Sequence, residues 1–210
     1  MIGIIEKVVV DCLLQEGGDE LRQDVFLAAG IPNDRVYRMD KHYPDTETAS
    51  LLSATMSVTG MEEAQLFQLF SAVFFDVVED VFPEFIRMCD TSEDLVRKQA
   101  KIHALIAAGS REPGESSKST DKFQLKDHGP YHISVRYKSD LQLPGLYEAL
   151  VKEAASLYGD EVALSRGDCP EGSGATIMTV KWVSIAGHPT EYAPEFQDLQ
   201  KTWGRGALHG

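Results

Sequence analysis

One histidine of this chain, His103, has a setting in which it could bind a ligand. Apolar residues recur every three or four positions over about residues 91–108, which predicts a helix, and Ala100 and Ala107 flank His103 along one side of it. These small neighbours leave room for a flat group beside the ring, and a neutral imidazole nitrogen is the usual protein ligand of haem iron. The alternative that this spacing leaves open is an ordinary core or surface histidine.

The remaining polar residues do not form a second candidate centre. His128 and His132 flank a turn and could meet, but two side chains do not close a metal site. The other histidines have no partner at helical ligand spacing, and Asp76, Glu79 and Asp80 read as a solvated face. The sequence contains no Gly-x-Ser-x-Gly, Walker-type or Gly-x-Gly-x-x-Gly motif. We therefore expect a protein that is not an enzyme.

A second informative stretch, about residues 61–81, predicts a helix that is apolar over half its circumference. The stripe and its extension are formed by Leu66, Leu69, Phe70, Val73, Val77 and Val81, with Phe67, Phe74 and Val78. Phe75 is expected on the far side. Such a helix either lies at the centre of a helical core or presents one edge to a nonpolar ligand.

Gly and Pro punctuation and a change of period define the elements that must position these residues. Helices are predicted at about 4–14, 20–29, 45–60, 61–81 and 91–108, a strand hairpin at 123–126 and 132–137, a helix at 146–158, and strands at 161–164 and 175–183. Helices followed by a meander-like sheet predict an α+β fold, with a helical part over about 1–110 and a sheet-containing part over about 121–183. Residues 184–210 are expected to form a C-terminal tail.

The overall composition limits the possible partners. The chain has 210 residues, 43% of them hydrophobic, and a net charge of −13, which repels nucleic acid and anionic membranes. The three cysteines are far apart and predict buried thiols rather than a disulfide framework or a zinc site. The first residues have no signal-peptide pattern, so we expect a cytoplasmic protein without a membrane segment.

Several of these features together resemble the haem nitric oxide/oxygen binding (H-NOX) domain family over about residues 1–183. The chain opens with Met1-x-Gly-Ile-Ile, places Phe82-Pro83 after the Phe-rich helix, and carries His103 in Lys-Ile-His-Ala-Leu. It continues with Tyr137-Lys-Ser139 and then a Gly-Leu pair at Gly145, where the family has Tyr-x-Ser-x-Arg followed by Gly-Leu. The order and spacing of these pieces carry the resemblance.

The resemblance implies an H-NOX fold with haem b (iron protoporphyrin IX) held by His103 as the metal ligand. It further implies that Tyr137 and Ser139 hydrogen-bond the haem propionates. The apolar helix, through Phe74 and Val78, together with Ile5, would line the pocket. An apolar pocket favours nitric oxide and carbon monoxide over dioxygen as the bound gas, and the signal would pass to a partner such as a histidine kinase or a diguanylate cyclase.

One position departs from the family pattern. Leu141 stands where the family has an arginine, Asp140 precedes it, and strand alternation places Arg136 and Lys138 on the face opposite Tyr137. The propionates would thus lose a charged partner. Two alternatives therefore stay open: a haem-free H-NOX-like domain that serves only protein interaction, and a small-molecule enzyme, for which no residue constellation is visible.

Overall fold

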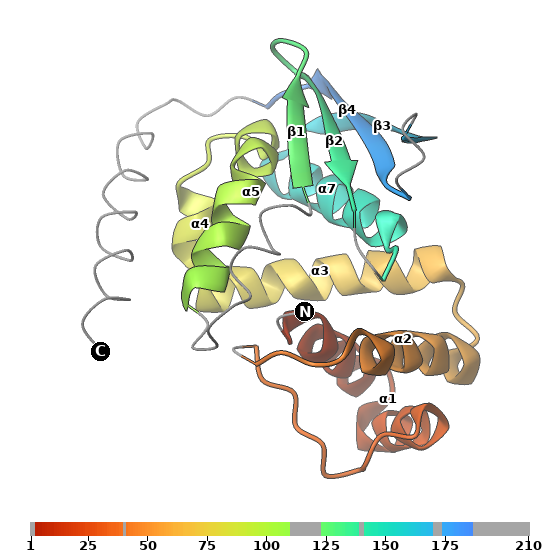
Figure 1. The fold of residues 1–210 in the computed structure, drawn as a ribbon. Helices are drawn as coiled ribbons and strands as arrows, with labels where there is room; N and C mark the ends of the chain where they lie inside the picture. Colours follow the sequence, from red (N-terminus) through yellow and green to blue (C-terminus); the bar gives the residue numbers. More distant parts are fainter. Residues whose placement is uncertain (1–2, 40, 110–122, 139–140, 170–173, 187–210) are drawn as a thin grey trace. The chain divides into compact units, whose positions relative to one another are not determined.

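The computed structural model describes residues 3–39, 41–109, 123–138, 141–169 and 174–186, and the chain divides into two compact units, Met1–Val77 and Val78–Gly210. The first unit holds α1 (Ile4–Ala29), α2 (Asp45–Thr59) and most of α3 (Glu63–Val81). The second holds the rest of α3 and the other elements, which are α4 (Pro83–Arg87), α5 (Ser92–Gly109), β1 (Phe123–Asp127), β2 (His132–Tyr137), α7 (Pro144–Tyr158), β3 (Glu161–Asp168) and β4 (Thr176–Ser184) (Figure 1). The join expected near residues 110–121 falls largely outside the described residues. Among the described helices, none has the length and apolar character needed to span a membrane.

Helix α1 is two helical segments joined at Gly18, as the Gly17-Gly18 pair predicted. Gly18 has φ 67° and ψ −159°, a conformation that is essentially restricted to glycine. The second segment ends at Gly30, whose left-handed conformation lets its N–H reach back to the carbonyl of Leu27. The break therefore follows from the sequence.

The core of the first unit lies where α1 packs against α2, through buried residues that include Val9, Leu13 and Leu51. A buried carboxyl is part of this contact. Glu6 is 0% exposed and accepts a hydrogen bond from the Thr48 hydroxyl. Burial raises the pKa of Glu6 above its ordinary value of 4.5, and the Thr48 hydrogen bond offsets only part of that rise.

The raised pKa predicts how stability depends on pH. In the unfolded chain Glu6 ionises above pH 4.5, whereas the folded chain holds the proton to higher pH, so stability falls as pH rises through that window. We expect the free energy of unfolding of the wild type to fall relative to that of Glu6→Gln by up to about 1.4 kcal/mol per pH unit above pH 4.5. Denaturant titrations of both proteins between pH 4.5 and 8 measure this, and a constant difference across the range would contradict it.

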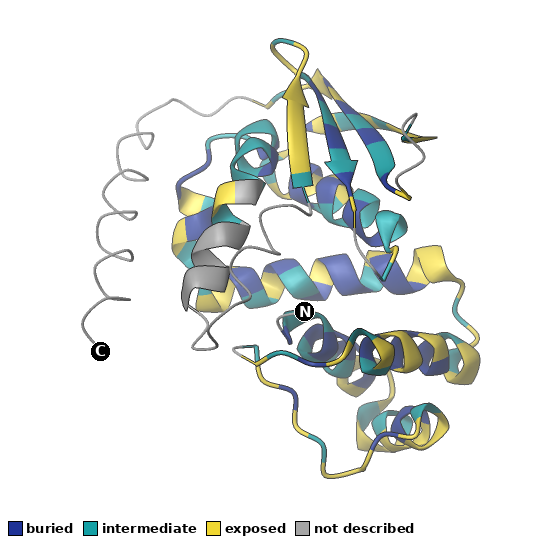
Figure 2. Ribbon diagram, viewed as in Figure 1, coloured by how far each residue is buried: buried dark blue, intermediate teal, exposed yellow. Residues whose placement is uncertain are grey.

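Helix α3 is buried on more sides than a single stripe. Leu66, Phe70 and Val73 of the predicted stripe are buried (Figure 2). One expectation is wrong: Val81, placed in the stripe, is 44% exposed. Phe75, expected on the far side, is only 8% exposed, so burial extends beyond the stripe. The helix is covered beyond one face in its middle, whereas its last residue is at the surface.

The second unit contains a four-stranded antiparallel sheet in the order β1-β2-β4-β3. Its strands alternate, so that Ile133, Val135 and Tyr137 of β2 share one face with Met178 and Val180 of β4. That face forms a core cluster with Val96 of α5 and with Tyr147 and Val151 of α7. The period of two in the sequence predicted the β1–β2 hairpin and the two later strands. The meander-like order was wrong, because β4 and not β3 pairs with β2.

A short helix, α4, was not predicted. Pro83 reads in the sequence as the stop after α3, and it also occupies the first turn of the next helix, where its missing N–H costs nothing. Phe85, Met88 and Cys89 form a second small core, onto which Leu95 and Ile102 of α5 pack. Burial raises the pKa of the Cys89 thiol to about 12, as expected for an unreactive core thiol.

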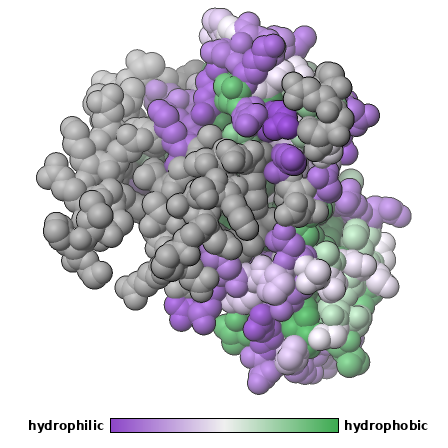
Figure 3. Space-filling view, in the orientation of Figure 1, coloured by the Kyte–Doolittle hydropathy of each residue, from purple (hydrophilic) through white to green (hydrophobic). Residues whose placement is uncertain are grey.

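The surfaces of the two units differ in character. Exposed large apolar side chains of the first unit include Leu14, Leu27 and Val36, and hydrophobic patches are visible on this unit in Figure 3. The hairpin end of the sheet-containing unit is mainly hydrophilic in the same view. The exposed large apolar side chains among the described residues of the second unit are those of Val81, Leu125, Tyr131, Leu157 and Val183.

Candidate functional site

Tyr137 ends β2 and lies on the buried face of the sheet. It is 7% exposed, and its ring centroid lies 5.4 Å from that of Phe123 and 6.5 Å from that of Tyr147. Val135 precedes it by two residues on the same face, as strand alternation requires. The hairpin therefore positions this phenol inside the second unit, as the alternating pattern predicted.

His103 lies in α5, and its side chain is outside the part of the structure that is described. The backbone nevertheless places it. Val96, seven residues earlier, packs in the core cluster that contains Tyr137, and seven residues are almost two full helical turns. His103 thus lies almost two helical turns beyond Val96, about 10 Å further along the axis of α5.

The other predicted site residues are distributed over both units. Ser139 lies outside the described residues. Ile5, in α1, is half-buried, and Val78, in α3, is buried. Phe74 is half-buried, with its ring stacked on Phe70 at 6.0 Å and edge-on to Phe75 at 5.4 Å. The structure therefore brings Tyr137 and the His103 side of α5 into one unit, whereas Ile5 and Phe74 belong to the other.

Contacts from Asp160 and Trp182, which sequence reasoning missed, fix the N-terminal end of α5 at Ser92. The Asp160 carboxylate accepts hydrogen bonds from the backbone N–H of Ser92 at 2.8 Å, the Ser92 hydroxyl at 2.6 Å and the backbone N–H of Ala186 at 2.9 Å. The indole N–H of Trp182 donates to the Ser92 hydroxyl at 2.8 Å. The side chains of Asp160, Ser92 and Trp182 are all buried. Asp160 thereby caps the helix that carries His103 and ties it to the end of β4.

Two cations hold the next turns of α5. Arg97 donates to the carbonyl of Gly129 at 3.0 Å and pairs with Glu93 at 2.8 Å, and Glu93 accepts the backbone N–H of Tyr131. Lys98 donates to the carbonyl of Met88 at 2.9 Å. The first half of α5 is therefore fastened to the β1–β2 turn and to the end of α4.

The polar groups near Tyr137 bear on whether a haem fits. Arg136 faces away from Tyr137 and donates to Gln124 at 3.4 Å, and Lys138 is exposed, as strand alternation predicted. Leu141 is half-buried and brings no charge. Inside the cluster, however, the hydroxyl of Tyr147 is fully buried and has no hydrogen-bond partner among the described residues. A hydroxyl without an acceptor in the cluster that joins Val96 of α5 to Tyr137 fits a group with carboxylate acceptors, and among the described residues no cation lies on this face of the sheet beside Tyr137.

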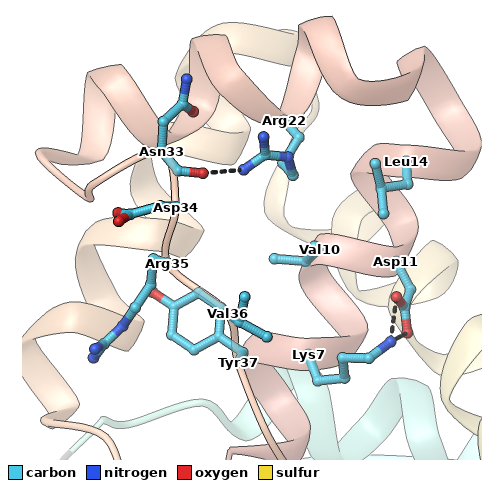
Figure 4. A pocket seen from close by; sticks show the side chains of 10 residues that line it. All are labelled: Lys7, Val10, Asp11, Leu14, Arg22, Asn33, Asp34, Arg35, Val36 and Tyr37. Carbon is cyan, nitrogen blue, oxygen red and sulfur yellow. Dashed lines mark hydrogen bonds and ion pairs between the residues drawn. The ribbon is translucent and has the colours of Figure 1, made fainter.

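A pocket of about 340 Å³ lies elsewhere, in the first unit between α1 and residues 33–37 (Figure 4). Four of its five charged side chains, those of Lys7, Asp11, Arg22 and Arg35, already have a partner. Lys7 pairs with Asp11 at 2.5 Å, Arg22 donates to the carbonyl of Asn33 at 3.0 Å, and Arg35 pairs with Glu47 at 2.8 Å. None of the predicted site residues lines this pocket. In the described part of the chain, no cluster of three or more His, Cys, Asp or Glu residues could hold a metal ion.

Comparisons with known proteins agree with the resemblance. A family model described as haem-NO-binding (HNOB) matches residues 2–166, while no curated protein matched the sequence. An H-NOX protein from S. oneidensis in the Fe(II)NO ligation state has a TM-score of 0.71 and 21% identity, covering 87% of this chain and 99% of that chain.

Two further solved structures share the fold. A single-substitution variant of Tt H-NOX has a TM-score of 0.70 at 13% identity, covering 90% of this chain and 98% of that one. An oxygen-binding H-NOX domain related to soluble guanylate cyclases has a TM-score of 0.68 at 13% identity, with the same coverage. The mixed α+β architecture is thus the H-NOX fold, and by its family match this chain belongs to the haem-NO-binding (H-NOX) family.

Proposed function

We propose that this protein is a haem-based gas sensor in which His103 would bind the haem iron and Tyr137 and Ser139 would hydrogen-bond the propionates. One observation carries the proposal: Val96, which precedes His103 on α5 by almost two helical turns, belongs to the same core cluster as Tyr137. The family match supports it. Residues 1–183 would form the haem-binding domain, with 184–210 as a tail.

When bound, the haem would supply a ferrous iron with one coordination position open to a diatomic gas. The side chains proposed for the pocket wall, Ile5, Phe74 and Val78, are apolar and donate no hydrogen bond. Haem-bound dioxygen is polar, and an apolar wall offers it no hydrogen bond. We therefore propose nitric oxide and carbon monoxide as the ligands rather than dioxygen. The protein would act as a sensor and not as an enzyme.

The contacts of α5 suggest how a signal would leave the site. The helix is fastened over its first turns by Asp160, Arg97 and Lys98. A displacement of His103 would therefore move the C-terminal half of α5 relative to the N-terminal half, which these contacts hold in place. An effector such as a histidine kinase or a diguanylate cyclase would read that movement.

The experiment that tests this function is an absorption spectrum of the reduced protein after loading with hemin, with and without nitric oxide, carbon monoxide and dioxygen. We expect an intense Soret band that shifts with nitric oxide and with carbon monoxide and does not shift with dioxygen. The apolar wall is the reason for that selectivity. A protein that remains colourless after hemin addition would refute the proposal.

A second candidate is a haem-free interaction domain with the same fold, and Leu141 at the family's arginine position is the observation that favours it. The two candidates separate in a hemin titration of the wild type and of Leu141→Arg. Binding by the wild type supports the sensor. Binding that appears only in Leu141→Arg supports a domain that has lost its cofactor.

A further inference from the structure

The hydroxyl of Tyr147 stands out among the polar groups of the second unit. Tyr147 lies in α7, is 3% exposed, and its hydroxyl oxygen has no hydrogen-bond partner in the described part of the chain. Burial raises the pKa of this phenol, so it remains a neutral donor at physiological pH. A buried donor without an acceptor destabilises the fold, and phenylalanine would fill the same space without that cost.

The neighbours of Tyr147 indicate the kind of acceptor it would meet. Its ring is nearly parallel to that of Tyr137, with an interplanar angle of 22° and centroids 6.5 Å apart. Phe123 contacts both rings, at 5.4 Å and 5.7 Å, and is itself only half-buried. The two tyrosine rings are therefore stacked and buried, and the half-buried ring of Phe123 lies against both.

The charges around this pair are unusual for a site that would hold an anion. Arg136 is on the opposite face of the sheet, paired with Gln124, and Leu141 offers no charge. A carboxylate arriving here would have to be held by neutral donors. A phenol hydroxyl is such a donor, and its hydrogen bond to an ionised oxygen is about twice as strong as one to a neutral oxygen.

We propose that the Tyr147 hydroxyl is a second hydrogen-bond donor, beside Tyr137, to a propionate carboxylate of the haem. The proposal rests on the proposed function and extends it: a buried neutral phenol takes over part of the task of the missing guanidinium. It also explains why a core position carries a hydroxyl that no described group of the protein satisfies.

The test compares Tyr147→Phe with Tyr158→Phe, a matched variant on the same helix whose hydroxyl is already used. Tyr158 donates to the carbonyl of Ile86 at 2.7 Å. Each apo protein is unfolded in denaturant, and each is titrated with hemin and with hemin dimethyl ester, in which both carboxylates are esterified and uncharged. Tyr147→Phe keeps the aromatic ring and its contacts, so this variant is expected to fold.

We expect Tyr147→Phe to leave apo stability unchanged or raise it, and to weaken hemin binding about tenfold. Its affinity for the dimethyl ester should equal that of the wild type. Tyr158→Phe should show the reverse pattern: lower apo stability and unchanged hemin affinity. This combination cannot arise from a purely structural role of Tyr147.

Three results would overturn the proposal, and they are distinguishable. Equal hemin affinity in the wild type and Tyr147→Phe would leave the hydroxyl without a role at the carboxylates. Equal weakening of hemin and ester binding would assign Tyr147 to packing or to another part of the cofactor. A wild type that binds neither compound would refute the proposed function itself, and this inference with it.

Discussion

Replacing His103 with glycine is expected to weaken hemin binding by at least about a hundredfold and to remove the Soret band of the reduced, hemin-loaded protein. The reason is that α5 would lose the imidazole that anchors the iron, and the hydroxyls of Tyr137 and Ser139 cannot replace a metal ligand. Added imidazole should restore part of the band, because glycine leaves space for it. The measurement is a hemin titration followed by absorbance, with and without imidazole.

His128→Gly is the matched control, because His128 is exposed and stacks on His132 with ring centroids 4.6 Å apart. Removing it should leave the specific band intact while removing an exposed imidazole that could bind hemin adventitiously. If His103→Gly keeps the wild-type spectrum, or if His128→Gly loses it, His103 is not the axial ligand.

Replacing Asp160 with alanine is expected to lower the free energy of unfolding by about 3–5 kcal/mol. Three donors lose one acceptor: the backbone N–H and hydroxyl of Ser92 and the backbone N–H of Ala186. The Ser92 N–H lies in the first turn of α5, where no intrahelical acceptor exists, so it stays buried and unpaired. Equilibrium denaturation at neutral pH measures the loss.

Asp168→Ala provides the control for this second prediction, because Asp168 is exposed at the end of β3. Its free energy of unfolding should stay within about 0.5 kcal/mol of the wild type. A loss below about 1 kcal/mol in Asp160→Ala would contradict the prediction and would mean that the buried carboxylate is not what holds the start of α5.

The helices and strands of this fold could be predicted from the sequence, because helix ends and hydrophobic periodicity depend on residues that are close together in the chain. The left-handed glycines after α1 and α2, Gly30 and Gly60, end their helices where the sequence indicates. The alternation of β2 predicted that Tyr137 faces the core and Arg136 does not. Each of these predictions depends only on residues that are adjacent in the sequence.

The parts that could not be predicted depend on contacts between distant residues. Asp160 and Ser92 are 68 residues apart, and no sequence motif around either residue predicts their contact. The burial of Phe75 was not predicted, because a helical wheel assumes one buried face, whereas the residues that cover a helix come from elsewhere in the chain. The role of His103 likewise stays a prediction, since its side chain lies outside the described residues.

The break at Gly18 has a mechanical consequence for α1. A helix transmits a push along its length only while its ladder of backbone hydrogen bonds is continuous, and at Gly18 the backbone leaves helical geometry. The segment that carries Ile5 and the segment that ends at Gly30 are therefore not obliged to move as one rigid helix.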